Sequence, residues 1–124
     1  MKKTGIVLTI SIGIIVILYV GLQLFSRMIY NTQSCERFNI DNIELRTGVN
    51  IPEIKSYDCA CTDNKKFSKF IIDTDKVDLD NYVTSNNFTL KNDLYIKEDD
   101  NKNGTYKVAF DKTTAELTVN LTYK

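Results

Sequence analysis

The sequence of 124 residues has no histidine and no tryptophan, and it contains only one proline and three cysteines. Without histidine, Ser-His-Asp and Cys-His nucleophile arrangements and histidine-ligated zinc are excluded, and the most common general base at neutral pH is missing. Paired carboxylates remain, but a sheet domain of this size seldom forms the deep cleft that glycoside hydrolysis needs. We therefore expect a protein that is not an enzyme and that has no cofactor or resident metal.

An excess of either charge is also missing, because 16 Lys and Arg residues balance 16 Asp and Glu residues. A protein that binds nucleic acid would carry a basic excess, so we expect no nucleic-acid partner. The length of the chain allows one globular domain and not two.

Residues 6–25 form the long apolar run of the chain. Of these 20 residues 15 are apolar and none is charged. A helix of 20 residues is about 30 Å long, which matches the hydrocarbon thickness of a bilayer. The weak helix preference of its many Ile and Val residues matters little in lipid, where every backbone polar group has to be paired within the segment. The run therefore predicts a transmembrane helix with the lipid bilayer as its partner.

A cleaved signal peptide is the alternative interpretation of this N-terminus. Lys2 and Lys3 supply a basic start, but the apolar core of a signal peptide is typically about 7–15 residues, shorter than this run. The stretch 24–34 contains no alanine, so no A-x-A-like cleavage site follows the run. We therefore expect an uncleaved, single-pass signal anchor, with residues 1–32 as anchor and tether.

The basic residues beside the apolar run predict its orientation. Lys2 and Lys3 precede the run together with the initiating amine, whereas only Arg27 follows it closely. The positive-inside rule then places the N-terminus in the cytoplasm and residues 33–124 outside the cell membrane. Abundant Lys, Asn and Ile with little Arg are typical of an AT-rich bacterial genome, so we expect a periplasmic or other extracytoplasmic location in a bacterial envelope.

Residues 33–124 predict a small α+β domain with an antiparallel sheet of about five strands and one or two short helices. We expect one helix at residues 42–47, capped by Asp41 and ended by Gly48, and another from a cap at Asp78 to about residue 86. The apolar pattern predicts strands near residues 53–61, 67–73, 94–98, 105–111 and 116–123. Turns are expected at residues 62–66, 99–104 and 111–114.

The three cysteines are the candidate site residues of this domain. Cys59 and Cys61 are two residues apart in a predicted strand, so their side chains share one face. A bond between Cys59 and Cys61 would close a strained small ring, so these two are not expected to be bonded to each other. A disulfide is nevertheless expected, because exported proteins retain disulfides. We therefore expect a structural bridge from Cys35 to either Cys59 or Cys61, with one thiol left over that is buried, pairs with another chain or exchanges with the bridge. A C-x-C redox or metal pair is the weaker alternative, because redox pairs are usually C-x-x-C and a four-ligand zinc site lacks its ligands.

Two acidic segments invite a calcium interpretation but have simpler explanations. The four aspartates between residues 73 and 80 surround a strand-to-helix junction, where aspartate ends a strand, caps a helix and complements the helix dipole. The pattern D-x-N-x-N-G at residues 99–104 matches the first half of an EF-hand loop, but its twelfth position is Phe110 instead of glutamate. We interpret the first segment as a helix cap and the second as a hairpin turn.

Together these features favour a membrane-anchored extracytoplasmic domain that binds another protein or an envelope component without catalysis. An edge or an open face of the sheet would supply the binding surface. Two alternatives stay open. One is an immunity or inhibitor-type protein tethered at the membrane against an incoming toxin, which a toxin gene next door would favour. The other is a thiol–disulfide protein that uses Cys59 and Cys61, which free-thiol counts with and without reductant would test.

Overall fold

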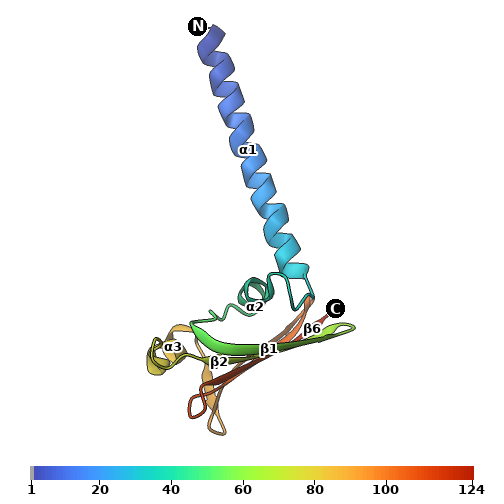
Figure 1. Ribbon diagram of the computed structural model, residues 1–124. Coiled ribbons are helices and arrows are strands. Elements are labelled where there is room, and N and C mark those ends of the chain that lie inside the picture. Colours follow the sequence, from blue (N-terminus) through green and yellow to red (C-terminus); the bar gives the residue numbers. More distant parts are fainter. Residues whose placement is uncertain (1) are drawn as a thin grey trace.

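A computed structural model describes residues 2–124 and shows a long helix, α1 (Lys2–Asn31), that projects from a small head (Figure 1). The helix continues beyond the apolar run, so residues 26–31 are helical where their polarity predicts a tether. Ile29 in this last part is buried, and its carbonyl oxygen accepts a hydrogen bond from Asn42 of the next helix, α2 (Asn39–Thr47). The end of α1 is thus part of the head and not a linker that leads to it.

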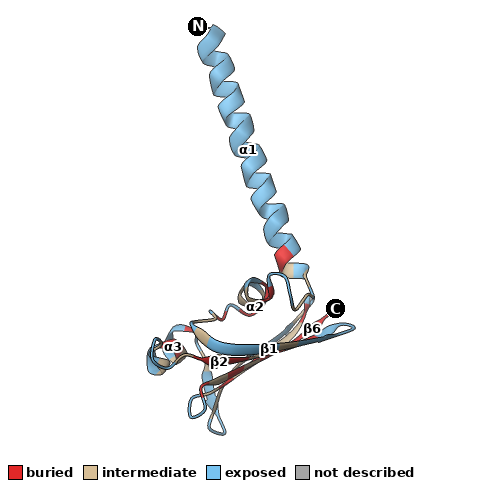
Figure 2. Cartoon of the chain, in the orientation of Figure 1, coloured by how far each residue is buried: buried red, intermediate tan, exposed pale blue. Residues whose placement is uncertain are grey.

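Among residues 2–124, α1 is the one helix that is long and apolar enough to cross a membrane. Every side chain of residues 2–28 is exposed, as the uniform pale blue of the rod shows (Figure 2). The hydroxyl groups of Thr9 and Ser11 donate hydrogen bonds to the carbonyl oxygens of Gly5 and Val7, each at 2.8 Å. These polar side chains are therefore satisfied within the helix, as the interior of a bilayer would require.

The head is an α+β domain with one antiparallel sheet, as the sequence predicts. After α2 its elements are β1 (Ile54–Thr62), β2 (Lys65–Ile72), α3 (Leu79–Ser85), β3 (Thr89–Lys91), β4 (Leu94–Asn101), β5 (Gly104–Asp111) and β6 (Glu116–Tyr123). The strand order is β1-β2-β6-β5-β4-β3. The last strand therefore lies in the middle of the sheet, and β1 and β3 form its edges.

The sheet has six strands, one more than the pattern predicts. The additional strand is β3, which pairs with β4 across the two-residue turn Asn92-Asp93. Both turn residues have positive φ, 48° and 66°, which is the backbone of a tight hairpin turn and which Asn and Asp tolerate better than most residues. The turn residues Asn92-Asp93 are the local signal for this hairpin, and the apolar pattern of the strands does not contain it.

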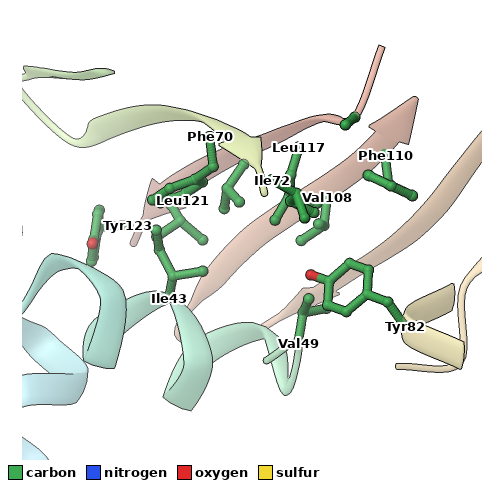
Figure 3. Close-up of a cluster of buried hydrophobic side chains, with 12 residues drawn as sticks. Ile43, Val49, Phe70, Ile72, Tyr82, Val108, Phe110, Leu117, Leu121 and Tyr123 are labelled. Atoms are coloured by element: carbon green, nitrogen blue, oxygen red, sulfur yellow. The ribbon is translucent and has the colours of Figure 1, made fainter. Parts of the chain in front are cut away.

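The core lies between one face of the sheet and the two short helices (Figures 1 and 3). Ile43 of α2, Val49 in the loop after it and Tyr82 of α3 cover this face. The sheet contributes alternate residues of its central strands, namely Phe70, Ile72, Val108, Phe110, Leu117, Val119, Leu121 and Tyr123. Burial of each large apolar side chain contributes about 1.5–3 kcal/mol, so this single layer holds the helices on the sheet.

Local signals place the two short helices in the head. Asp78 caps α3, because its Oδ1 accepts hydrogen bonds from the backbone N–H groups of Asp80 and Asn81. Gly48 ends α2 with φ 70°, as predicted. The predicted start of α2 is wrong: the helix begins at Asn39 after Phe38, which has φ 54° and makes no side-chain cap, so Asp41 lies inside the first turn. In place of a cap, the ring of Phe38 packs edge to face against Phe25 of α1, with ring centroids 5.5 Å apart.

Candidate functional site

The three cysteines lie close together near the C-terminal end of α1. Cys35 and Cys59 form a disulfide with their Cα atoms 5.7 Å apart, and Cys61 is an exposed free thiol. All three sulfur atoms lie within 4.8 Å of one another. Cys59 and Cys61 share one face of β1 because side chains alternate along a strand, and the segment after α1 carries Cys35 to that face.

The structure thus forms the bridge with Cys59, one of the two pairings that the sequence allows. Cys59 and Cys61 are not bonded to each other. The thiol of Cys61 donates to the backbone oxygen of Gln33 at 3.0 Å, so the same short segment that contains Cys35 also holds the free thiol in place.

Asn42 is the centre of a buried hydrogen-bond network between α1, α2 and the sheet. Its side chain has no exposed surface. Nδ2 donates to the carbonyl oxygens of Ile29 at 2.8 Å and Tyr30 at 2.9 Å. These carbonyls lie in the last turn of α1, where no N–H group of the helix is left to bond them. Asn42 therefore caps the C-terminal end of α1 with its side-chain amide.

The amide oxygen of Asn42 accepts from two residues of the sheet. Lys66 Nζ donates to it at 2.6 Å, and the hydroxyl of Tyr123 lies 2.8 Å away. The same hydroxyl lies 2.9 Å from the backbone oxygen of Thr32, so its single proton is shared between two acceptors. Burial raises the pKa of Tyr123 to about 12, against the lowering effect of the nearby Arg46 charge. The phenol is therefore a neutral donor at any physiological pH.

Lys66 is a buried cation in this network, with 1 % of its surface exposed. Its side chain points inward because it occupies the core-facing row of β2 that continues through Ser68, Phe70 and Ile72. Burial lowers the pKa of Lys66 from 10.5 to about 8; the charge of Cys61 counteracts this shift and that of Arg46 adds to it. Cys61 is the residue that pairs with Lys66 across β1 and β2, so the ammonium group borders the cysteine cluster.

Arg46 closes the network on the solvent side. Its guanidinium carbon lies 4.5 Å from the ring centroid of Tyr30 and 4.2 Å from that of Tyr123, a sandwich that favours the cation. Nε donates to the Tyr30 carbonyl at 2.7 Å, and a terminal nitrogen donates to the Asn103 carbonyl at 3.2 Å. The side chain thus joins α1, α2 and the β4–β5 turn.

A second polar pair lies beneath the disulfide. Asn39 donates from Nδ2 to the hydroxyl of Ser68 at 3.3 Å, and that hydroxyl donates to the sulfur of Cys59 at 3.5 Å. Both residues are buried. Within residues 2–124, Oδ1 of Asn39 is the one buried side-chain nitrogen or oxygen atom without a hydrogen-bond partner. The disulfide therefore borders a polar interior and not an apolar one.

The sequence did not predict the roles of Asn42 and Lys66. The sequence predicts a turn at residues 62–66, but Lys65 and Lys66 both belong to β2, which begins at Lys65. A signal was present, because position 66 precedes Ser68, Phe70 and Ile72 at intervals of two. A lysine in such a row indicates either a strand end or a buried cation with a partner, and only the fold supplies that partner.

The acidic segments follow the simpler explanations. Asp73 accepts from the backbone of Asp75 at 3.0 Å in a turn, and Asn101 accepts from the backbone of Asn103 at 2.8 Å in the β4–β5 hairpin. In the described chain, the cysteine cluster is the one group of three or more His, Cys, Asp or Glu side chains close enough to share a metal ion. Two of its sulfurs are consumed by the disulfide.

A groove of about 830 Å³ lies beside α3. It is lined by residues 50–54 before and within the start of β1 and by residues of the segment 76–86. Backbone atoms there are already paired: the hydroxyl of Tyr82 donates to the Asn50 carbonyl at 2.7 Å, and Asn86 accepts from the Asn50 N–H at 2.7 Å.

Comparisons with protein-family models, with curated proteins and with solved structures found no match to this chain.

Proposed function

We propose that the protein is a single-pass, membrane-anchored domain that binds a protein partner outside the cytoplasmic membrane of a bacterium, without catalysis. The observation that carries the proposal is the fixed connection between α1 and the head. The exposed apolar surface of residues 6–25 requires a cover, which a bilayer supplies. The Asn42 network holds the base of the same helix, so the head is displayed in one orientation.

The contacts of α2 support a head that rests on the membrane surface. The rings of Phe25 and Phe38 meet edge to face with centroids 5.5 Å apart. Phe25 is the last residue of the apolar run, so Phe38 lies at the depth where the hydrocarbon would end. Phe38 and Leu45 are 42 % and 49 % exposed, and the bilayer interface would cover both side chains.

Charge and cysteine chemistry support the outward orientation. Lys2 and Lys3 precede α1's apolar run and favour a cytoplasmic N-terminus. A disulfide between Cys35 and Cys59 is stable in an oxidising compartment and rare in the cytoplasm of mesophiles.

The free edge of β1 is the surface that we assign to the partner. β1 pairs with β2 on one side and lies at the end of the sheet, whereas the opposite edge strand, β3, has only three residues. The register shift between Ile54 and Ser56 leaves residues 56–62 as the regular part of this edge. Unpaired backbone groups of an edge strand bind an extended peptide by strand addition.

A photo-crosslinking experiment tests the assignment with a matched control. Ala60 on the edge and Asn120 on β6 are both exposed and lie in one row across the sheet, with Phe67 between them. A photoreactive amino acid is placed at either position of the full-length protein in native membranes. We expect one adduct of defined mass from position 60 and none from position 120. Absence of an adduct at both positions, or a stronger one at position 120, would contradict binding at the edge.

A further inference from the structure

We propose that the three cysteines form a thiol–disulfide exchange site, in which Cys61 displaces Cys59 from its bond to Cys35. This activity goes beyond the binding function and does not depend on it. The carrying observation is that a free thiol lies within 4.8 Å of both sulfurs of a disulfide.

The exchange is balanced within the chain. The thiolate of Cys61 attacks the sulfur of Cys35, an S–S bond forms between these two, and the electron pair of the old bond leaves on Cys59. The proton lost by Cys61 ends on Cys59, and no oxidant or reductant is consumed. Attack on Cys59 instead would join residues two apart on one strand in a strained ring, so Cys35 is the productive target.

Polar groups stand beside both the attacking and the leaving sulfur. In the register of β1 and β2, Cys61 pairs with Lys66 and Cys59 pairs with Ser68. Burial lowers the pKa of Lys66, and the charge of Cys61 opposes part of this lowering. The Ser68 hydroxyl donates to the Cys59 sulfur at 3.5 Å, a contact that stabilises the leaving thiolate. Lys66 and Ser68 are positioning residues in this scheme.

The exchange changes which thiol faces solvent. Cys61 is exposed, whereas Cys59 is half-buried. In the Cys35–Cys59 form the free thiol is that of Cys61, which is accessible to other thiols and disulfides. In the Cys35–Cys61 form the free thiol is that of Cys59, which is shielded. The Cys35 sulfur already lies within 4.8 Å of the Cys61 sulfur, so the two atoms have to approach by at most about 3 Å to reach the S–S bond length of about 2.05 Å.

Thiol mapping of the full-length protein in detergent micelles tests the exchange. The protein is incubated without reductant, alkylated with N-ethylmaleimide, digested and sequenced by mass spectrometry, with fragment ions across Ala60 separating label on Cys59 from label on Cys61. We expect a majority of label on Cys61 and a measurable minority on Cys59. Label on Cys61 alone, or three labelled cysteines, would overturn the proposal.

Variants test the pairing and the positioning separately. Cys59→Ser, oxidised with glutathione disulfide, should form the Cys35–Cys61 bond and retain no alkylatable thiol; two free thiols in this folded variant would overturn the proposal. Ser68→Ala should lower the share of label on Cys59 several-fold, and Ser68→Thr should restore it. An unchanged share in Ser68→Ala would show that no hydrogen bond assists the leaving sulfur and would overturn this part of the scheme.

Discussion

The ammonium group of Lys66 donates a hydrogen bond to the amide oxygen of Asn42 at 2.6 Å, at a place where neither side chain is more than 1 % exposed. A neutral amide is an unusual principal partner for a buried cation, since buried charges are commonly paired with opposite charges. Asn42 is suited to the position because it has two donors and one acceptor oxygen. A carboxylate there would not donate to the helix end.

Replacement of Asn42 should loosen the connection between α1 and the head. In Asn42→Leu the carbonyls of Ile29 and Tyr30 each lose one of their hydrogen-bond donors, and Lys66 is left as a buried cation without its acceptor. We expect a loss of about 2–4 kcal/mol in the free energy of unfolding, measured by urea unfolding of the full chain in micelles with near-UV circular dichroism.

The matched control for this variant is Asn120→Ala, which removes an exposed amide from the centre of the sheet. Its effect should stay within about 0.5 kcal/mol. Equal effects of the two substitutions would contradict a special role of Asn42.

Lys66 should make the head more stable as pH rises from about 8 to 10.5. The pKa of Lys66 is about 8 in the folded state against an ordinary value of 10.5, so in this interval the unfolded chain binds more protons than the folded chain. Stability then increases with pH, and it falls again as pH drops towards 8. Well below pH 8 Lys66 is protonated in both the folded and the unfolded chain, so its contribution to the free energy of unfolding no longer changes with pH.

Lys66→Met removes this charge while keeping an unbranched side chain of similar length. The variant should have a higher urea midpoint than the parent near pH 7.5 and a smaller increase between about pH 8 and 9.5. The upper limit stays below the ordinary tyrosine pKa of about 10, so most unfolded tyrosines are still neutral there. Parallel pH profiles of the two proteins would show that Lys66 is not the group responsible.

The disulfide should stabilise the head by about 3 kcal/mol, the value that loop-closure entropy gives for a separation of 24 residues. Cys35→Ser removes the bridge in either pairing, so it should lower the free energy of unfolding by about this amount. Cys61→Ser is the matched control, because it removes the thiol and keeps the bridge. If Cys61→Ser were as damaging as Cys35→Ser in urea unfolding, the bridge would not be the source of stability.

Gly104 is required by a close backbone approach in the β4–β5 hairpin. A Cβ atom at this position would lie 2.1 Å from the backbone oxygen of Thr122, and φ is +147°. Because the neighbour is backbone of the central strand β6, it cannot move aside. Gly104→Ala should therefore cost more than about 2 kcal/mol, whereas Gly13→Ala, which meets nothing within 4 Å, should leave the thermal midpoint of the head unchanged.

The parts of the fold that the sequence predicts are those with local causes. Asp78 caps α3 through its own side chain, and Gly48 ends α2 because its backbone adopts positive φ. The alternation of Leu117, Val119, Leu121 and Tyr123 gives β6 its bounds, residues 116–123, without reference to the rest of the chain.

The parts that the sequence does not predict depend on contacts between distant residues. β3 has three exposed residues and no apolar period, so only its pairing with β4 makes it a strand. Lys66 is the first residue of the core-facing row of β2, and its charge is acceptable there because Asn42, 24 residues earlier, supplies an acceptor. The choice of Cys59 over Cys61 as the partner of Cys35 likewise depends on how the segment after α1 meets β1.

Membrane topology is the most direct test of the central claim, that α1 lies in the bilayer and holds the head outside the cell membrane. Spheroplasts that express the full-length protein are treated with protease from outside, and their membranes are then extracted with alkaline carbonate. We expect the untreated protein to stay in the membrane with its N-terminal helix intact, and the added protease to degrade the head. Full-length protein in the soluble cytoplasmic fraction, or a head that resists protease until the spheroplasts are lysed, would contradict the account.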